Sequence, residues 1–182
     1  MKKAITVRHL AFDAMLAAMY LALSFASIRL AGQKISISGL PVLMGALLFG
    51  PLHGFLIGLV GAFLEQLLSY GLAATTLLWC LPVAIRGLLV GCYAKWRKFD
   101  LGQIELIVVI ALTALILTAL NTAVMYIDAV IYGYYSYAYV FGALVSRIVV
   151  GVITGVVFAL VLPPLMKPVK KVIQAIDKTA GS

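Results

Sequence analysis

The chain consists of long apolar stretches separated by short polar segments. About 20 apolar residues in an α-helix cross the hydrocarbon core of a bilayer. Five stretches approach or exceed this length, and they predict transmembrane helices over residues 8–29, 51–70, 76–94, 104–131 and 138–162. A sixth stretch, residues 40–49, extends only about 15 Å as a helix, half of the core. The pattern predicts an all-α membrane protein with six transmembrane helices.

Polar and helix-breaking residues set the boundaries between these helices. Gly50 and Pro51 separate the short helix from the next one, and proline suits the first turn of a helix. The polar segment 29–39 contains an alternating run, Lys34–Ser38, which is typical of an extended chain. Because this run is short and has no evident partner strand, we expect an ordered loop that folds back over the helices. Residues 132–139 form a tyrosine-rich turn.

The C-terminal region is expected to leave the membrane. The last helix should stop at Pro163 and Pro164, because proline removes a backbone donor and its ring clashes with the preceding turn. Beyond it, apolar residues recur at helical spacing with lysines between them, which is typical of an amphipathic helix on a membrane surface. These are Val169, Val172, Ile173 and Ile176. We therefore divide the chain into a transmembrane domain, residues 1–166, and a basic amphipathic cytoplasmic tail, residues 167–182.

Composition and charge agree with a membrane protein. Of the 182 residues, 64% are hydrophobic and 11% are charged, against about a quarter charged in soluble domains. The net charge is +8, and most basic residues lie in three clusters beside apolar stretches, at residues 2–8, 95–98 and 167–178. Basic residues that flank transmembrane helices mark the cytoplasmic side. The clusters therefore indicate that both termini are cytoplasmic, and they do not indicate nucleic-acid binding.

The first helix carries a stripe of small residues. Ala14, Ala18, Ala22 and Ala26 recur every fourth residue and therefore lie along one face of the helix. In a membrane, such a face lets a second helix approach closely, and dispersion drives the contact. Two interpretations are open at this point: an internal packing seam between helices of this chain, or a docking face for a different protein.

Polar and ionisable residues recur in the outer half of the predicted bundle. Charged groups at this depth cost several kcal/mol unless they are paired or hydrated, so they are typical of functional sites. One interpretation is structural, with ion pairs between Arg86 and Glu65 and between Arg147 and Asp128. The other is a site where arginines bind a carboxylate and aromatic rings stack on a flat ring of the ligand. The candidate substrate-binding residues are Lys34, Glu65, Gln66, Thr75, Trp79, Arg86, Asn121, Asp128 and Arg147.

Other residues argue against transport by the chain alone and against catalysis. The inner halves of the helices hold Gly, Ala, Leu and Val, so no polar path continues to the cytoplasmic side. His9 and His53 are expected to lie far apart without metal-ligand spacing, and Asp13 is expected to face His9 one turn away. Cys80 and Cys92 share a predicted helix about 18 Å apart, too far for a disulfide. No HExxH or GxSxG motif is present, so we expect no enzyme activity and no metal site.

The topology, the alanine stripe and one further run together resemble a known family. The polar segment after the first helix leads into LPVLMGALLFGPLHGFLIGLVGAFLEQLL, residues 40–68, and the tail is basic. The chain resembles the substrate-binding S components of energy-coupling factor (ECF) vitamin transporters over nearly its whole length, most closely over residues 11–68. The LFGPxxGxxxG run, residues 48–58, is most like the folate branch.

The resemblance implies a division of roles. In that family, the alanine motif of the first helix contacts a transmembrane coupling subunit that is attached to two cytoplasmic ATPases, so Ala14, Ala18 and Ala22 would be the docking stripe. The S component captures a vitamin outside and releases it inside with these partners. ATP would be used by the partner subunits, and this chain would hold no cofactor. Residues 29–39 would form a lid over the pocket, and the location would be a prokaryotic plasma membrane.

The substrate and the mode of transport have alternatives. Folate suits the candidate residues, because its pterin ring needs stacking and hydrogen-bond partners and its carboxylates need arginine. Pantothenate would use an arginine without a stacking platform, and riboflavin, thiamine, pyridoxine or a queuosine precursor are further candidates. A self-sufficient small transporter, dimeric through the alanine stripe, would need polar groups that reach the inner face. An intramembrane enzyme is the third class of function, and the sequence contains no catalytic motif that would support it.

Overall fold

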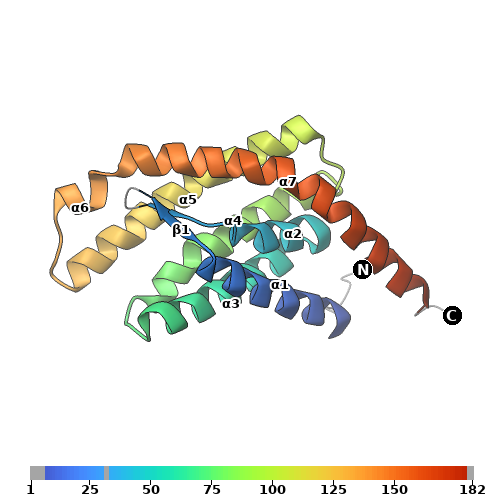
Figure 1. Cartoon of the computed structure of the whole chain (residues 1–182), viewed down its shortest axis with the longest axis horizontal. Coiled ribbons are helices and arrows are strands. Elements are labelled where there is room, and N and C mark those ends of the chain that lie inside the picture. Colours follow the sequence, from blue (N-terminus) through green and yellow to red (C-terminus); the bar gives the residue numbers. More distant parts are fainter. Residues whose placement is uncertain (1–6, 31–32, 180–182) are drawn as a thin grey trace.

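The computed structural model describes residues 7–30 and 33–179, and the side chains of residues 8, 28–35, 170 and 172–179 are outside this description. Each of the six predicted apolar helices is present, the last of them divided in two. In chain order the elements are α1 (Val7–Phe25), β1 (Ile28–Leu30), β2 (Gln33–Ile35), α2 (Gly39–Phe49), α3 (Pro51–Tyr70), α4 (Thr76–Trp96), α5 (Gln103–Ile131), α6 (Tyr137–Phe141) and α7 (Leu144–Thr179) (Figure 1).

The helices pack around the short helix α2. α1 packs on α2 and α3, and α3 packs on α4 along most of its length. α5 packs on α4 and α7, and α7 also contacts α2. Residues 41–47 of α2 are all buried, with Val42 and Leu43 fully so. The ten-residue apolar stretch is therefore surrounded by the other helices of the chain, which explains why it has no need to span the core alone.

The two ends of the bundle differ in the segments that they carry. Figure 1 shows the start of α1, the connection between α4 and α5 and the end of α7 at one end, with the α3–α4 and α5–α6 connections at the other. This arrangement places two basic stretches, residues 95–98 and 167–171, at one end, whose cytoplasmic assignment stays a prediction. Residues 2–6 of the third cluster lie outside the described part of the chain. By length and composition, α3, α4, α5 and residues 137–169 are long and apolar enough to cross a membrane, and α1 and α2 contribute shorter apolar helices. The predicted class, an all-α membrane protein, is confirmed.

Glycines allow the backbones of α3 and α4 to touch. A Cβ atom added to Gly87 would lie 2.2 Å from the carbonyl oxygen of Gly54, and one added to Gly58 would lie 2.9 Å from the carbonyl oxygen of Val83. No side chain fits at these distances. Small residues at such a contact are typical of membrane helices, where close packing rather than water release holds the helices together. The contact fixes the separation of α3 and α4, the two helices that carry Glu65 and Arg86.

Segment 29–39 differs from the prediction. β1 pairs antiparallel with β2, with Ile28 opposite Ile35 and Leu30 opposite Gln33, so the expected loop contains a β-hairpin. α1 accordingly ends at Phe25 rather than at residue 29. β1 was not predicted, because its residues, Ile-Arg-Leu, continue the apolar stretch of the first helix. The extended run that contains β2 therefore had no predicted partner strand. The expectation that this segment folds back over the helices is confirmed, since β2 contacts α7.

The last helix also differs from the prediction. A break at residues 142–143 separates α6 from α7, and Tyr137 and Tyr139 of the expected tyrosine turn are helical. α7 then runs through Pro163, Pro164 and Pro168 to Thr179 instead of stopping. Each proline removes only its own backbone donor, so a helix supported by neighbours bends there without ending. Figure 1 shows the change of direction in the C-terminal part of α7.

The boundary drawn at residue 166 consequently falls within one continuous helix. The side chains of residues 170 and 172–179 lie outside the described part of the chain, and so do residues 180–182. The amphipathic character of the tail and its position on a membrane surface therefore stay predictions.

Candidate functional site

A cavity of about 310 Å³ lies between α3, α4, α5 and α7, and we call it the arginine cavity. This volume is within the range of small-molecule sites, about 300–1,000 Å³. Ser36 and Ser38, from the segment between β2 and α2, also line it. The structure brings together here four of the predicted substrate-binding residues, one from each of these helices: Glu65, Arg86, Asn121 and Arg147.

Arg86 is the most unusual group in this cavity. Its side chain is only 7% exposed. Its Cζ atom lies 5.4 Å from the centroid of the Phe158 ring, a cation–π contact that orients the guanidinium. Within the described part of the chain, its Nε and Nη2 atoms have no hydrogen-bond partner. Buried donors without acceptors are costly, and a guanidinium presents them in a fork that matches a carboxylate. The site therefore presents unused donors for an anionic or acceptor-rich ligand.

The two predicted structural ion pairs, Arg86–Glu65 and Arg147–Asp128, are absent among the described residues, so that interpretation is wrong. Glu65 instead accepts a hydrogen bond from the Tyr20 hydroxyl, at 2.8 Å from Oε2. Arg147 donates from Nη2 to the backbone carbonyl of Tyr139 at 3.4 Å. Arg86 and Arg147 thus line one cavity, and neither forms an ion pair with the acidic residue that was predicted as its partner.

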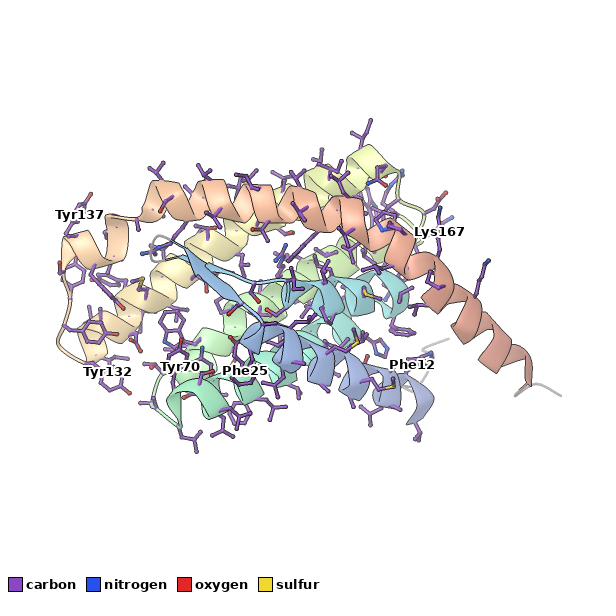
Figure 2. The ribbon with its side chains drawn as sticks, viewed as in Figure 1. Phe12, Phe25, Tyr70, Tyr132, Tyr137 and Lys167 are labelled. Carbon is purple, nitrogen blue, oxygen red and sulfur yellow. The ribbon has the colours of Figure 1, made fainter. Side chains whose placement is uncertain are left out.

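The remaining predicted residues line a second cavity of about 430 Å³, which we call the aromatic cavity. It lies at the end of the bundle that holds the α3–α4 and α5–α6 connections, and Figure 2 shows Tyr70 and Tyr132 at this end, opposite Lys167. Gln66, Thr75, Trp79 and Asp128 line it together with Tyr70, Tyr132, Tyr134 and Tyr139. The expectation of one convergent pocket is therefore corrected to two cavities. They adjoin at Arg147, because its acceptor Tyr139 lines the second cavity.

Helix geometry explains the division. Glu65 and Gln66 are consecutive in α3, so their side chains point about 100° apart, one toward each cavity. Asn121 and Asp128 share a face of α5, but they lie two turns apart, about 10 Å along the axis. Position along the chain predicts the depth of these residues in the bundle, but it does not predict the rotation of each helix about its axis.

Asp128 joins three segments at the aromatic cavity. Its carboxylate is 8% exposed. Oδ1 accepts hydrogen bonds from the Thr75 hydroxyl at 2.5 Å and from the Trp79 indole at 3.3 Å, and Oδ2 accepts one from the Tyr134 hydroxyl. These bonds tie the start of α4 to the end of α5 and to the turn after it. The same hydrogen bond from Tyr134 raises the pKa of that phenol, because the phenolate form would face the carboxylate.

Lys34 is the one candidate that the described side chains leave out. Its backbone lies in β2 opposite Arg29. The Lys34 side chain is outside the described residues, so its place in a binding site stays a prediction.

The alanine stripe faces outward. Ala14, Ala18 and Ala22 are exposed along α1, whereas the opposite face packs on the bundle. On that buried face, Asp13 and Tyr20 are each only 4% exposed. The interpretation of the stripe as an internal seam is therefore wrong for this chain. Which molecule covers it stays a prediction.

Sequence reasoning missed several cavity residues, among them two aromatic ones, and one polar contact. Tyr20 and Phe158 line the arginine cavity. A hydroxyl-bearing ring within the apolar first helix was an available signal for Tyr20, but Phe158 had none. In the N-terminal half of α1, His53 Nδ1 donates to Asp13 Oδ2 at 2.7 Å, and the rings of His9 and His53 lie 5.6 Å apart.

The expectation that the two histidines lie far apart is therefore wrong. Asp13 interacts electrostatically with His9, as expected, but its hydrogen bond is to His53. The sequence pattern considered neighbours along one helix, whereas the packing of α3 on α1 brings His53 to the same place. Within the described residues, no three His, Cys, Asp or Glu side chains are grouped to hold a metal ion. Cys80 and Cys92 are free, as expected from their separation.

The fold and the two cavities define the class of this protein: it is a helical membrane protein whose bundle contains cavities of the size of a small ligand. The family model described as "ECF-type riboflavin transporter, S component" matches residues 4–171. The chain therefore belongs to this family of S components. It is a family of membrane-embedded transporter subunits and not a family of enzymes, in agreement with the resemblance found in the sequence.

Several solved structures are similar to this chain, and two of them are S components or vitamin-bound proteins by their descriptions. One, described as "Structure and mechanism of the S component of a bacterial ECF transporter", has a TM-score of 0.66 and 20% identity, over 90% of this chain and 98% of that one. The other, "Crystal structure of FolT bound with folic acid", has a TM-score of 0.61 and 18% identity, over 87% of this chain and 95% of that one. At these identities the likeness shows the fold alone. Comparison with curated protein sequences gives no match.

Proposed function

We propose that this chain is the high-affinity vitamin-binding subunit of an ECF-type importer and that its vitamin is folate. The observation that carries the proposal is Arg86, a buried guanidinium with two donor nitrogens that lack a partner among the described residues. Arg147 lines the same cavity. A carboxylate bound between the two arginines would supply the missing acceptors and balance their charge.

Folate has parts that suit both cavities. Its glutamate carboxylates would bind in the arginine cavity, where Asn121 would add a polar contact, Glu65 would lie on the same wall, and Lys34 would add a cation from the hairpin. Its pterin ring would lie in the aromatic cavity, stacked on Trp79, with Gln66 and Thr75 as hydrogen-bond partners. Asp128 accepts three hydrogen bonds there, and a carboxylate has about four lone-pair sites, so it retains capacity for a ring N–H. The contact between Arg147 and Tyr139 marks where such a ligand would pass from one cavity to the other.

Riboflavin is the second candidate, because the matching family model is described by that vitamin. Its flat ring would suit the aromatic cavity. It has no carboxylate, so it would leave the two arginines without an anionic partner. This difference in charge lets one experiment separate the two vitamins.

The exposed alanine stripe supports a role in a larger assembly. Ala14, Ala18 and Ala22 would contact a transmembrane coupling subunit joined to two cytoplasmic ATPases. Vitamin would be captured outside and released inside through this association. ATP would be hydrolysed by the partner subunits, with no cofactor in this chain.

Ligand identity tests the proposal directly. The full chain is purified in detergent, denatured, and the released small molecules are identified by mass spectrometry. The ligand-free protein is then titrated with folic acid and with riboflavin by calorimetry. We expect folic acid to co-purify and to bind with a Kd below about 1 μM, and riboflavin at least about tenfold more weakly. Tighter binding of riboflavin would replace folate with the second candidate, and binding of neither would overturn the proposed substrate.

A further inference from the structure

We propose that Tyr20 is the positioning residue through which occupancy of the arginine cavity sets the position of α1 and of its exposed alanine face. The inference rests on the proposed function, which makes the cavity a ligand site and the alanine stripe a docking face. It adds a physical link between them, so that the partner-facing surface depends on whether the cavity is filled.

Tyr20 is the point where α1 reaches the cavity. Its side chain is 4% exposed and lines the cavity together with Arg86 and Glu65. No other residue of α1 that the structure describes lines this cavity. The Tyr20 hydroxyl donates to Oε2 of Glu65 at 2.8 Å, which joins α1 to α3 at the cavity wall.

The Tyr20 ring has little freedom to move without its helix. A Cβ atom added to Gly61 would lie 2.7 Å from Cδ1 and 2.9 Å from Cγ of Tyr20, so the ring lies directly on the backbone of α3. A buried ring in such close contact cannot swing to a new rotamer without displacing its neighbours. A shift of the hydroxyl is therefore passed to the backbone at residue 20. Ala18 and Ala22 lie within one turn of that residue, on the exposed side of α1.

A bound anion would change the surroundings of this hydroxyl. A carboxylate between Arg86 and Arg147 brings negative charge to the wall that Glu65 also lines. Like charges repel strongly in a low-dielectric cavity, and the ligand also offers the hydroxyl a second acceptor. The hydrogen bond from Tyr20 then follows the displaced Glu65 or transfers to the ligand. Either change gives α1 a different position in the filled state.

A second polar contact supplies the fixed end of this motion. His53 donates to Asp13 at 2.7 Å, and neither residue lines the arginine cavity. The two contacts hold the same face of α1 against α3, about 10 Å apart along the helix. Occupancy acts on the contact at Tyr20 and not on the one at Asp13. We therefore expect α1 to tilt about its N-terminal end, near Asp13.

Distances between two spin labels test the link. The full chain in lipid nanodiscs carries Cys92→Ser with Met19→Cys and Ile153→Cys, because Met19 of α1 and Ile153 of α7 are 47% and 59% exposed and lie outside both cavities. Folic acid is added to saturation, so that a changed affinity cannot alter occupancy. We expect the distance distribution to shift with folic acid in this background and not after addition of Tyr20→Phe, which removes only the hydroxyl.

His53→Gln is the matched control, because it changes the other α1–α3 contact, away from the cavity, while the glutamine amide can still donate to Asp13 and hold the N-terminal end of α1. We expect this variant to retain the shift. A shift that persists in Tyr20→Phe overturns the link, and so does an equal loss in His53→Gln, which would indicate general loosening of α1.

A ligand-independent arm separates this inference from the proposed function. If folic acid does not bind the labelled protein, the substrate assignment fails, and Arg86→Gln then perturbs the charge of the empty cavity. A label shift caused by Arg86→Gln that disappears when Tyr20→Phe is added supports the link. A shift of the same size in both backgrounds, or in neither, overturns it.

Discussion

His53 Nδ1 lies 2.7 Å from Oδ2 of Asp13, and this hydrogen bond joins α3 to α1 across 40 residues of sequence. Asp13 is 4% exposed, and its Oδ1 atom has no partner in the described part of the chain. Removing the one partner of a buried carboxylate is strongly destabilising, because water cannot replace the lost hydrogen bond. The contact therefore holds the N-terminal end of α1 more firmly than its single hydrogen bond implies.

Replacing His53 alone should destabilise the protein more than replacing both residues. We expect His53→Leu to lower the free energy of unfolding by about 3 kcal/mol, since it leaves Asp13 buried without its donor. The double variant Asp13→Leu/His53→Leu should recover much of this loss, because two apolar side chains replace a buried polar pair. Thermal unfolding in one detergent measures both. A double variant as unstable as the sum of the two single variants would contradict the argument.

Loss of the Arg147 guanidinium should weaken binding of an anionic vitamin selectively. We expect Arg147→Ala to reduce folic acid affinity by about 1.5–3 kcal/mol, the scale of a hydrogen bond to a charged group. Riboflavin affinity should change much less, since that ligand has no carboxylate. Calorimetric titration of the purified variant gives both values.

Arg97→Ala is the matched control for this experiment. Arg97 lies at the opposite end of the bundle, where it bonds Glu105 at 2.6 Å and lines neither cavity. We expect its removal to leave folic acid binding unchanged. Equal affinity of Arg147→Ala and the unmodified protein would show that Arg147 has no contact with the ligand.

The outward face of α1 should be needed for uptake and not for binding. Ala18→Trp places a bulky ring on the exposed stripe, where a partner helix could no longer approach closely. We expect it to abolish ATP-dependent vitamin uptake by cells that also express the coupling and ATPase subunits, while ligand binding by the isolated chain persists. Ile153→Trp provides a control at an exposed position of α7 and should transport normally. Loss of binding in Ala18→Trp would indicate that the stripe supports the fold itself.

The sequence predicted the helix boundaries well where glycine or proline residues interrupt the helix. α3 begins at Pro51 and ends at Tyr70 as predicted, because Gly50 and Gly71 have positive φ angles that stop a helix on both sides. α7 shows the limit of the same reasoning. Its prolines have the local signature of a stop, but packing against other helices carries the helix through them.

The candidate site was predictable in composition and not in geometry. Charged residues within apolar stretches, such as Arg86 and Asp128, are conspicuous in the sequence, because burying an unpaired charge in a membrane costs free energy and such residues are usually functional. Their assignment to two cavities depends on the rotation of each helix about its axis. Contacts far apart in sequence fix that rotation, for example Tyr20 with Glu65, and no local pattern encodes them.

The bond between Tyr134 and Asp128 should make the closure of the aromatic cavity depend on alkaline pH. Asp128 raises the pKa of Tyr134 above the usual value near 10. A pKa raised in the folded state stabilises the bond fully below the unfolded value, and this contribution is lost as the pH rises through the folded value. We therefore expect the turn after α5 to stay closed on α4 near neutral pH and to open only above about pH 10.

Trp79 reports this change, because it donates to the same carboxylate. Trp96→Phe removes the other tryptophan, which is 74% exposed, so that the remaining fluorescence comes from Trp79. We expect an alkaline fluorescence transition in this background that disappears in Tyr134→Phe. Tyr137→Phe is the control, since Tyr137 is 73% exposed and lines neither cavity, and it should retain the transition. An unchanged transition in Tyr134→Phe would mean that another group opens the cavity.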